Sequence, residues 1–260
     1  MQTKYPLVFV HGIAIKDIFF IKSFGRIDKY LTNEGYKIYK PKVDSFGTIE
    51  HNAEVLKKEI EQILEKENVD KVNIIAHSKG GLDSKYMIQK LGMEDKVASL
   101  TTLCTPHKGS PIAENILRLP KWFLKFLAFW INLFYRIFGD KKPDSLTVCK
   151  QLSTSKDIEE ETFDISDKIY CQSYSTKMNR MRDDFTMSIP YMFSHYFQKG
   201  KDTDGLVPTE SAIFGEYKGV AFKEGVSHSE VMGYSLSKKK RHRVYDFYSD
   251  LCRDLASRGY

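Results

Sequence analysis

Residues 72–84, V-N-I-I-A-H-S-K-G-G-L-D-S, constrain the fold of this chain more than any other stretch. The apolar residues at its start predict a buried strand, and residues 79–91 carry a pattern that a helix can adopt. Between them lies Ser78, with the small residues Ala76 and Gly80 two positions before and after it. Larger side chains at those two positions would clash where a strand turns sharply into a helix. The pattern therefore predicts a serine at a tight turn, beside the positive end of the following helix.

Strand-like and helix-like stretches alternate along the chain. Residues 7–10 form a continuous apolar run, typical of a strand that is buried on both faces of a parallel sheet. Residues 50–66 carry apolar side chains on one stripe and Lys and Glu on the other, which predicts an amphipathic helix. Further strands are expected at 36–43, 98–103, 168–174 and near 220–222, and helical stretches at 17–32 and 244–255. The alternation predicts an α/β fold: a mostly parallel central sheet with helices on both faces and a site at the carboxyl ends of the strands.

Length and composition fit one α/β domain with an insertion. The 260 residues are 42% hydrophobic and 28% charged, which leaves enough apolar side chains for a sizeable core. A net charge of +6, without basic residues interleaved with aromatic ones, argues against nucleic acid as a partner. The four cysteines lack the spacing of a metal site. No apolar signal segment precedes the first strand, so we expect a cytoplasmic or peripheral membrane protein, or a secreted one if the sequence is a mature form.

Residues 112–138 hold both tryptophans and a dense set of phenylalanines. Lysine, asparagine and arginine interrupt the segment, so it does not predict a transmembrane span, and Pro120 is expected to divide it into two helices. It could pack in the core or present a wide apolar face to lipid, and we favour a lid or an interfacial helix. We expect residues 111–198 to form a helical lid or cap insertion within a single domain, 1–260. Its expected substrate-binding residues are Trp122, Phe126, Phe129 and Trp130.

The basic cluster at residues 238–243 also has two interpretations. It can be the solvated start of the C-terminal helix, or it can contact an anionic membrane. We favour the solvated start.

A serine hydroxyl at neutral pH needs an adjacent base, and the base needs a carboxylate that orients it. In one known arrangement of such triads, the order along the chain is Ser, then Asp or Glu, then His. His228 lies in a small-residue loop, G-V-S-H-S, and fits the base; His195 precedes the D-G-L-V-P stretch and breaks the order, and His242 lies among lysines and arginines. For the carboxylate we prefer Asp204, at an Asp-Gly turn, to Asp202 two residues earlier.

Four stretches of the chain, Y-P-L-V-F-V-H-G, A-H-S-K-G-G-L-D-S-K-Y, T-P-H-K-G-S and D-G-L-V-P, resemble the bacterial triacylglycerol lipases of the α/β-hydrolase superfamily. The Pseudomonas and Burkholderia group is the most similar. The resemblance covers residues 5 to about 110 and 200 to 230, whereas residues 112–195 match only in position, as the lid and cap of those lipases. It implies the α/β-hydrolase fold.

The resemblance also implies a role for each site residue. Ser78 would be the nucleophile, Asp204 the acid and His228 the base. The oxyanion hole would be formed by the backbone N–H groups of Ile13 and Lys79. We interpret His11, which precedes the first of these loops, as part of the scaffold rather than as a base.

The chain departs from those lipases at two positions. Ala76 stands where the group has Gly, but other lipases also use Ala there. The group binds a structural calcium partly through an Asp two residues after the histidine; here that position is Glu230, which has a longer side chain, and the sequence offers no second ligand. We therefore predict no metal and no other cofactor.

Together these residues predict a serine ester hydrolase, either a lipase or a carboxylesterase, that acts on lipid or other hydrophobic esters through an acyl-enzyme. The expected partners are such an ester and a lipid interface or membrane surface. Two alternatives stay open. An acyltransferase would use the same triad, and a non-catalytic membrane-docking protein would use the aromatic segment, although the three triad positions argue against the latter.

Overall fold

The computed structural model describes residues 2–13, 22–153, 168–197 and 200–260. Within them, six parallel strands form one sheet in the order β2-β1-β3-β4-β5-β6. The strands are β1 (Leu7–Val10), β2 (Ile38–Tyr39), β3 (Val72–His77), β4 (Val97–Leu103), β5 (Tyr170–Ser175) and β6 (Glu216–Val220). The predicted α/β fold with a parallel central sheet is confirmed.

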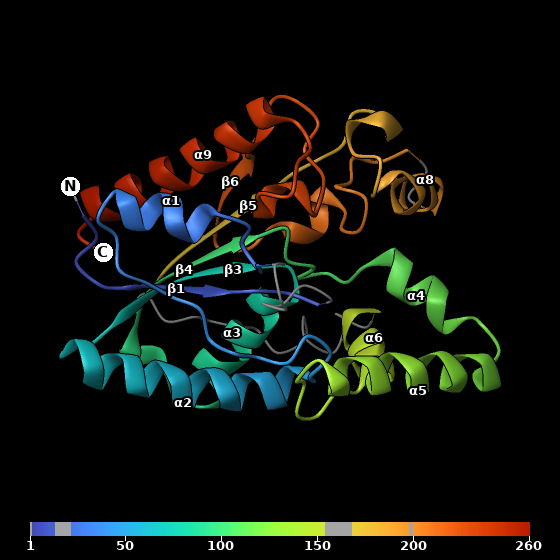
Figure 1. Cartoon of the computed structure of the whole chain (residues 1–260), viewed down its shortest axis with the longest axis horizontal. Coiled ribbons are helices and arrows are strands. Elements are labelled where there is room, and N and C mark those ends of the chain that lie inside the picture. Colours follow the sequence, from blue (N-terminus) through green and yellow to red (C-terminus); the bar gives the residue numbers. More distant parts are fainter. Residues whose placement is uncertain (1, 14–21, 154–167, 198–199) are drawn as a thin grey trace.

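Helices cover both faces of this sheet. One face carries α1 (Ile27–Asn33) and α9 (Lys238–Ser257), and the other carries α2 (Ile49–Glu67) and α3 (Lys79–Lys90) (Figure 1). Alternate residues of β1 enter the two resulting cores, because side chains of a strand point to opposite faces in turn. Every residue of β1, β3 and β4 is buried, which explains the continuous apolar run of β1 and the mainly apolar or small residues of β3 and β4.

The chain reverses its direction of winding between β1 and β3. From β1 it first moves outward to the edge strand β2 and then returns to β3 on the other side. In an open parallel sheet, such a switch point leaves a crevice at the carboxyl ends of the two strands. The loops that follow β1 and β3 meet there.

Four further helices lie beyond the carboxyl ends of the strands (Figure 1). They are α4 (Pro111–Leu117), α5 (Lys121–Ile137), α6 (Ser145–Ser153) and α8 (Ser188–Phe197). Pro120 precedes α5 directly, so the expected division of the aromatic segment into two helices is confirmed. The expected cap, 111–198, includes residues 154–167 and 198, which lie outside the described residues. Short 3-10 helices complete the fold: η1 (Glu94–Lys96), η2 (Met181–Asp183), η3 (Thr209–Ala212) and η4 (Glu230–Met232).

Several element boundaries differ from the sequence prediction. The strand expected at 36–43 pairs only over Ile38–Tyr39, and Pro41, which has no N–H for a ladder, follows shortly after. α9 begins six residues before the expected start, because the Ser237 side chain caps its first turn by accepting a hydrogen bond from the Lys240 N–H. The stretch expected to be helical at 17–32 forms helix only from Ile27, and residues 14–21 lie outside the described residues. The last strand, expected near 220–222, occupies Glu216–Val220 instead.

In the part of the chain that the structure describes, no helix has both the length and the apolar character needed to cross a bilayer. α5, which is 17 residues long, consists mainly of aromatic and aliphatic residues.

Candidate active site

Ser78 occupies a strained turn between β3 and α3. Its backbone has φ 54° and ψ −131°, in a region that a side chain other than glycine rarely adopts. The turn packs tightly against the end of β1: a Cβ added at Gly80 would lie 2.6 Å from the carbonyl oxygens of Val10 and His11. The requirement for a small residue two positions after the serine is therefore steric, as the sequence indicated. The turn directs the Ser78 side chain to the wall of a cavity.

His228 and Asp204 form a buried pair. The Nδ1 atom of His228 lies 2.6 Å from Oδ2 of Asp204, and the other carboxylate oxygen accepts hydrogen bonds from the N–H groups of Leu206 (2.9 Å) and Val207 (2.7 Å). The His228 N–H also donates to the Asp204 carbonyl oxygen at 2.9 Å. These contacts fix the imidazole ring on its Nδ1 side. His228 lines the same cavity as Ser78.

The alternative acid lies elsewhere. Asp202 is more than half exposed and pairs with the Lys177 ammonium at 2.9 Å on the surface. Asp204, in contrast, is 1% exposed. Of the two candidate carboxylates, the structure brings only Asp204 to His228.

The loop that carries His228 is held by a carboxylate that the sequence analysis did not single out. Oδ2 of Asp184 accepts hydrogen bonds from the hydroxyls of Ser227 (2.6 Å) and Ser229 (2.8 Å), the two neighbours of the base. Partial burial alone would raise the pKa of Asp184, but these hydrogen bonds and those from Thr186 hold the pKa below its usual value. No motif links Asp184 to a loop more than forty residues away, so only the G-V-S-H-S spacing offered a signal.

The environment of Glu230 does not fit a calcium ligand. Its carboxylate is buried and already accepts hydrogen bonds from the Lys240 ammonium at 3.1 and 3.2 Å, from the Ser235 hydroxyl at 2.6 Å and from the Ser227 N–H at 3.2 Å. The same ammonium donates to the Asp183 carbonyl oxygen at 2.7 Å. A cationic side chain of this chain therefore neutralises the acid at the position that the resemblance associates with calcium.

The two expected oxyanion donors both adjoin Ser78. Lys79 is the first residue of α3, where a backbone N–H has no acceptor within the helix. Ile13 follows Gly12, whose added Cβ would lie 2.6 Å from the Cβ of Ser78, and Ile13 lines the cavity. His11 is buried and its Nδ1 contacts the Gly12 carbonyl oxygen at 2.8 Å, consistent with a scaffold role.

Behind the base lies a second buried histidine. His77 donates from Nε2 to the His228 carbonyl oxygen at 3.1 Å, and the two rings lie 4.5 Å apart. Burial, and then the nearby His228, hold the pKa of His77 well below its usual value, so the ring stays neutral. Cys104, whose thiol lies 3.3 Å from the Thr176 hydroxyl, completes a group of metal-ligand types within 4.8 Å of one another. Burial raises the pKa of the Cys104 thiol. One ring nitrogen of each histidine already has a protein partner, so the group fits packing around His228 better than a metal site.

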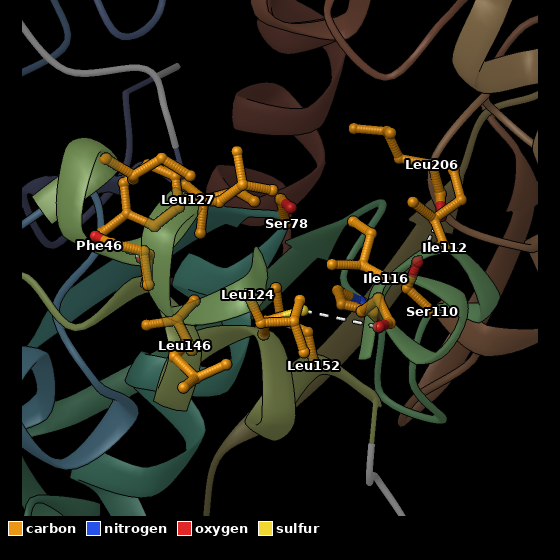
Figure 2. A pocket seen from close by; sticks show the side chains of 18 of the residues that line it. Phe46, Ser78, Ser110, Ile112, Ile116, Leu124, Leu127, Leu146, Leu152 and Leu206 are labelled. Carbon is orange, nitrogen blue, oxygen red and sulfur yellow. Dashed lines mark hydrogen bonds between the residues drawn. The ribbon is translucent and has the colours of Figure 1, made fainter. Parts of the chain in front are cut away.

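The cavity has a volume of about 360 Å³ and an almost entirely apolar wall. Figure 2 shows aliphatic side chains from α4, α5 and α6 gathered around it, with Ser78 at its edge. The apolar lining comprises Ile13, Phe46, Ile112, Ile116, Leu124, Leu127, Ile131, Leu146, Val148, Leu152 and Leu206, among others. Ser78 and His228 thus lie on a mainly apolar surface that is suited to a hydrocarbon chain, and Ser110, Ser145 and Cys149 are its other polar lining residues.

The four aromatic residues expected to bind substrate do not line this cavity. Trp122, Phe126, Phe129 and Trp130 are 53–72% exposed and lie on the outer face of α5, so this part of the sequence prediction is corrected. The helix lines the cavity with its opposite, aliphatic face instead. Both faces are apolar, and their periodicity alone did not distinguish the inner one.

The parallel sheet with its switch point, the serine at a strained strand-to-helix turn and the buried Asp–His pair define an α/β-hydrolase. The family model described as palmitoyl protein thioesterase matches residues 6–164, which is more than half of the chain. The chain belongs to this family.

Curated relatives and solved structures agree with this assignment. Triacylglycerol lipase 2 of Saccharomyces cerevisiae is 26% identical over 262 residues, covering 90% of this chain and 73% of the yeast protein. A triacylglycerol lipase of Burkholderia plantarii is 30% identical over 59% of this chain, and the match spans about half of that protein (46%).

Two solved structures share the fold. The mature lipase of Bacillus licheniformis superposes with a TM-score of 0.70 at 19% identity, over 96% of this chain and 92% of that structure. A metagenomic carboxyl esterase gives a TM-score of 0.73 at 15% identity, over 98% and 77%. The predicted similarity to triacylglycerol lipases, the α/β-hydrolase fold and the class of lipase-like ester hydrolase are confirmed.

Proposed function

We propose that this protein hydrolyses esters of long-chain fatty acids, with Ser78 as nucleophile, His228 as base and Asp204 as the carboxylate that orients the base. One observation carries the proposal: Ser78 and His228 both lie on the wall of a largely apolar cavity of about 360 Å³. A hydrocarbon chain gains about 0.8 kcal/mol for each methylene that leaves water, so such a cavity favours long acyl groups.

The geometry supports acyl transfer in two stages. In the first, Ser78 Oγ attacks the ester carbonyl carbon while His228 Nε2 takes its proton, and Asp204 stabilises the imidazolium that forms. The carbonyl oxygen becomes negative next to the N–H groups of Ile13 and Lys79, each of which would lower the barrier by about 3 kcal/mol. His228 then returns the proton to the departing alcohol. In the second stage, a water molecule, deprotonated by His228, releases the fatty acid and restores Ser78.

The chemistry described here needs no metal. Every charge that develops is met by a backbone N–H, by His228 or by Asp204, and Lys240 neutralises Glu230. We expect turnover to be unchanged by EDTA at millimolar concentration. A loss of activity that added calcium restores would contradict this part of the proposal.

We further propose that the outer face of α5 contacts the surface of the lipid that holds the substrate. Its aromatic side chains are exposed, and the exposed Lys121, Lys125 and Arg136 lie on the same helix, with Lys141 and Lys142 just beyond its end. Aromatic rings at headgroup level with flanking cations suit an anionic membrane surface. The opposite face of the same helix lines the cavity, so an ester leaving the bilayer would have a short apolar path to Ser78.

The experiment that tests the activity is hydrolysis of p-nitrophenyl esters from acetate to palmitate, with and without a lipid emulsion. We expect kcat/KM to rise with chain length, turnover to increase at the emulsion, and Ser78→Ala to abolish both. A palmitoyl thioester belongs in the same panel, because the matching family model is named for thioesterases.

The other outcomes are equally informative. Turnover confined to short soluble esters would contradict the long-chain assignment and leave a simple esterase. Acyl transfer to an added alcohol in preference to water would identify an acyltransferase. Vesicle binding without turnover of any ester would leave the non-catalytic docking protein.

A further inference from the structure

Lys79, the residue directly after Ser78, carries a fully buried ammonium. Lys79 and Asp83 are each 1% exposed, and Nζ of the lysine lies 2.6 Å from Oδ1 of the aspartate. A cation in the first turn of a helix opposes the helix dipole, and a buried ion pair loses much of its attraction to the cost of removing both charges from water. The stability of α3 alone therefore does not account for this pair.

A third buried side chain completes the pair. Asn52 of α2, 1% exposed, donates from Nδ2 to Oδ2 of Asp83 at 2.9 Å and to the Asp44 carbonyl oxygen at 2.9 Å. Its Oδ1 accepts the Asp44 N–H at 3.1 Å. Both carboxylate oxygens of Asp83 thus have partners, and the chain of hydrogen bonds leads from α3 to the loop at residues 44–46. A fully satisfied buried network of this kind holds its members in one geometry.

The loop at residues 44–46 in turn anchors the segment that follows α5. Oδ2 of Asp44 accepts the Lys142 N–H at 2.7 Å, the Phe46 N–H donates to Oδ2 of Asp140 at 2.9 Å, and the Phe46 carbonyl oxygen accepts the Asp144 N–H at 2.7 Å. Phe46 itself lines the cavity. A continuous set of contacts therefore joins the residue after the nucleophile to the end of the lipid-facing helix.

We propose that the Lys79–Asp83 ion pair is a positioning device that aims the Lys79 N–H at the ester oxygen and couples this donor, through Asn52 and Asp44, to the anchor of α5. This inference rests on the proposed function, because it assigns a role within the same site. Lys79 has two roles in this proposal: its backbone N–H contacts the substrate, and its side chain determines the position of that N–H. Burial raises the pKa of the Asp83 carboxyl to about 6, whereas the adjacent Lys79 and the hydrogen bond from Asn52 act in the opposite direction.

The test separates positioning from stability by removing the pair without leaving a buried charge. Lys79→Met and Asp83→Leu are made singly and together, because replacing both partners of a buried ion pair by apolar groups is often neutral or stabilising, whereas removing one is not. Lys85→Met is the matched control: Lys85 is a buried lysine on the same helix whose ammonium lies over the Phe214 ring at 4.8 Å.

Three quantities are measured for each variant: the thermal midpoint, kcat and KM for a p-nitrophenyl ester, and the rate at which a fluorophosphonate probe labels Ser78. For the double variant we expect a midpoint near that of the wild type, KM within about twofold, and kcat and labelling rate lower by roughly 10- to 100-fold, towards the loss seen when an oxyanion donor is removed. Lys85→Met is expected to lower the midpoint and leave kcat within about twofold. If Asp140 belongs to the coupled unit, Asp140→Ala lowers kcat in the wild type but adds little in the double variant.

A double variant with wild-type kcat and labelling rate would overturn the inference, since the pair would then be only structural. An equal loss of kcat in Lys85→Met would overturn it as well, because any disturbance of α3 would have the same effect. Wild-type protein that labels at Ser78 but hydrolyses no ester would contradict the proposed function alone, and the labelling rates would still decide the role of the pair.

Discussion

Replacing Gly80 by alanine adds one methyl group to the tightly packed turn around Ser78 and therefore tests that packing. A Cβ there would lie 2.6 Å from two backbone oxygens at the end of β1, and backbone cannot move aside as a flexible side chain can. We expect Gly80→Ala to lower the free energy of unfolding by about 1–3 kcal/mol, measured by urea denaturation. Ser84→Ala, which only removes the 2.7 Å hydrogen bond to the Gly80 carbonyl oxygen, is the control and should cost about 1 kcal/mol. Equal stability of Gly80→Ala and wild type would show that the turn is looser than described.

Asp204 and Asp202 form a natural pair for testing the acid. Asp204→Asn keeps an oxygen for the N–H groups of Leu206 and Val207 but removes the charge beside His228, and kcat is expected to fall by about 10⁴ with little change in the thermal midpoint. Asp202→Asn removes only a surface ion pair, so kcat should stay within about twofold. Steady-state kinetics of both variants show which aspartate orients His228. A larger loss of kcat from Asp202→Asn would assign that role to Asp202 instead.

The residues of the proposed triad could be selected from the sequence because each lies in a recognisable local pattern. A turn with small neighbours singled out Ser78, an Asp-Gly dipeptide singled out Asp204, and a small-residue loop singled out His228. The residues that hold these three in place could not be predicted from the sequence. Asp184 meets the His228 loop from more than forty residues away, and Lys240 meets it from α9, ten residues after Glu230. An isolated charged residue in a sequence does not reveal its partner.

At the scale of elements, α5 presents aromatic rings and cations on its outer face that can be removed separately. We expect Trp122→Ser with Phe126→Ser to weaken binding to phosphatidylcholine vesicles with and without phosphatidylglycerol, since apolar burial does not depend on lipid charge. Lys121→Gln with Lys125→Gln should weaken binding only to the anionic vesicles, by about fivefold for each lysine at about 1 kcal/mol per charge. Vesicle co-sedimentation measures both.

The inner face of the same helix supplies the control. Ile131→Trp is expected to fill part of the cavity, so that turnover of palmitate esters falls while turnover of acetate esters and vesicle binding stay near wild type. Loss of vesicle binding in Ile131→Trp, or equal binding by the outer-face variants and wild type, would contradict the assignment of the two faces.

The elements themselves were predictable to different degrees. A continuous apolar run predicts a strand that is buried on both faces, such as β1, and helical periodicity predicts the amphipathic helix α2. α8 lies within the expected cap but was not predicted as a helix of its own, because large apolar side chains occupy both its buried side (Tyr191) and its exposed side (Ile189 and Phe193). α9 was predicted too short. Its first six residues are all basic, so no apolar periodicity indicated that the helix begins at Lys238, directly after the Ser237 cap.

For the molecule as a whole, two buried histidines make the free energy of unfolding depend on pH. Burial holds the pKa of both His77 and His107 well below the usual 6.5, so the unfolded chain binds protons more readily than the folded one. The contribution of these two histidines to stability is therefore present above pH 6.5 and is lost as the pH drops below it, by up to about 1.4 kcal/mol per pH unit for each histidine. His107→Gln should unfold with a shallower loss of stability between pH 6.5 and 5 in urea titrations. An unchanged slope would show that His107 is protonated in the folded state.

The overall architecture illustrates what local sequence cannot supply. Alternating strands and helices predict a parallel sheet, but the order β2-β1-β3-β4-β5-β6 depends on which strand pairs with which across long stretches of chain. The position of the crevice, between the loops after β1 and β3, follows from that order. The position of the crevice could be predicted only from the family resemblance or from the fold.

The two ends of the described chain meet on the side of the sheet away from α4 and α5 (Figure 1). The Lys4 N–H donates to the Tyr260 carbonyl oxygen at 2.7 Å, so residues at the two ends are adjacent. A fluorescent protein or a resin linker attached at either end would consequently point away from α4 and α5. A short peptide could also join the two ends, which makes the fold a candidate for circular permutation, with new ends opened on an exposed loop remote from Ser78.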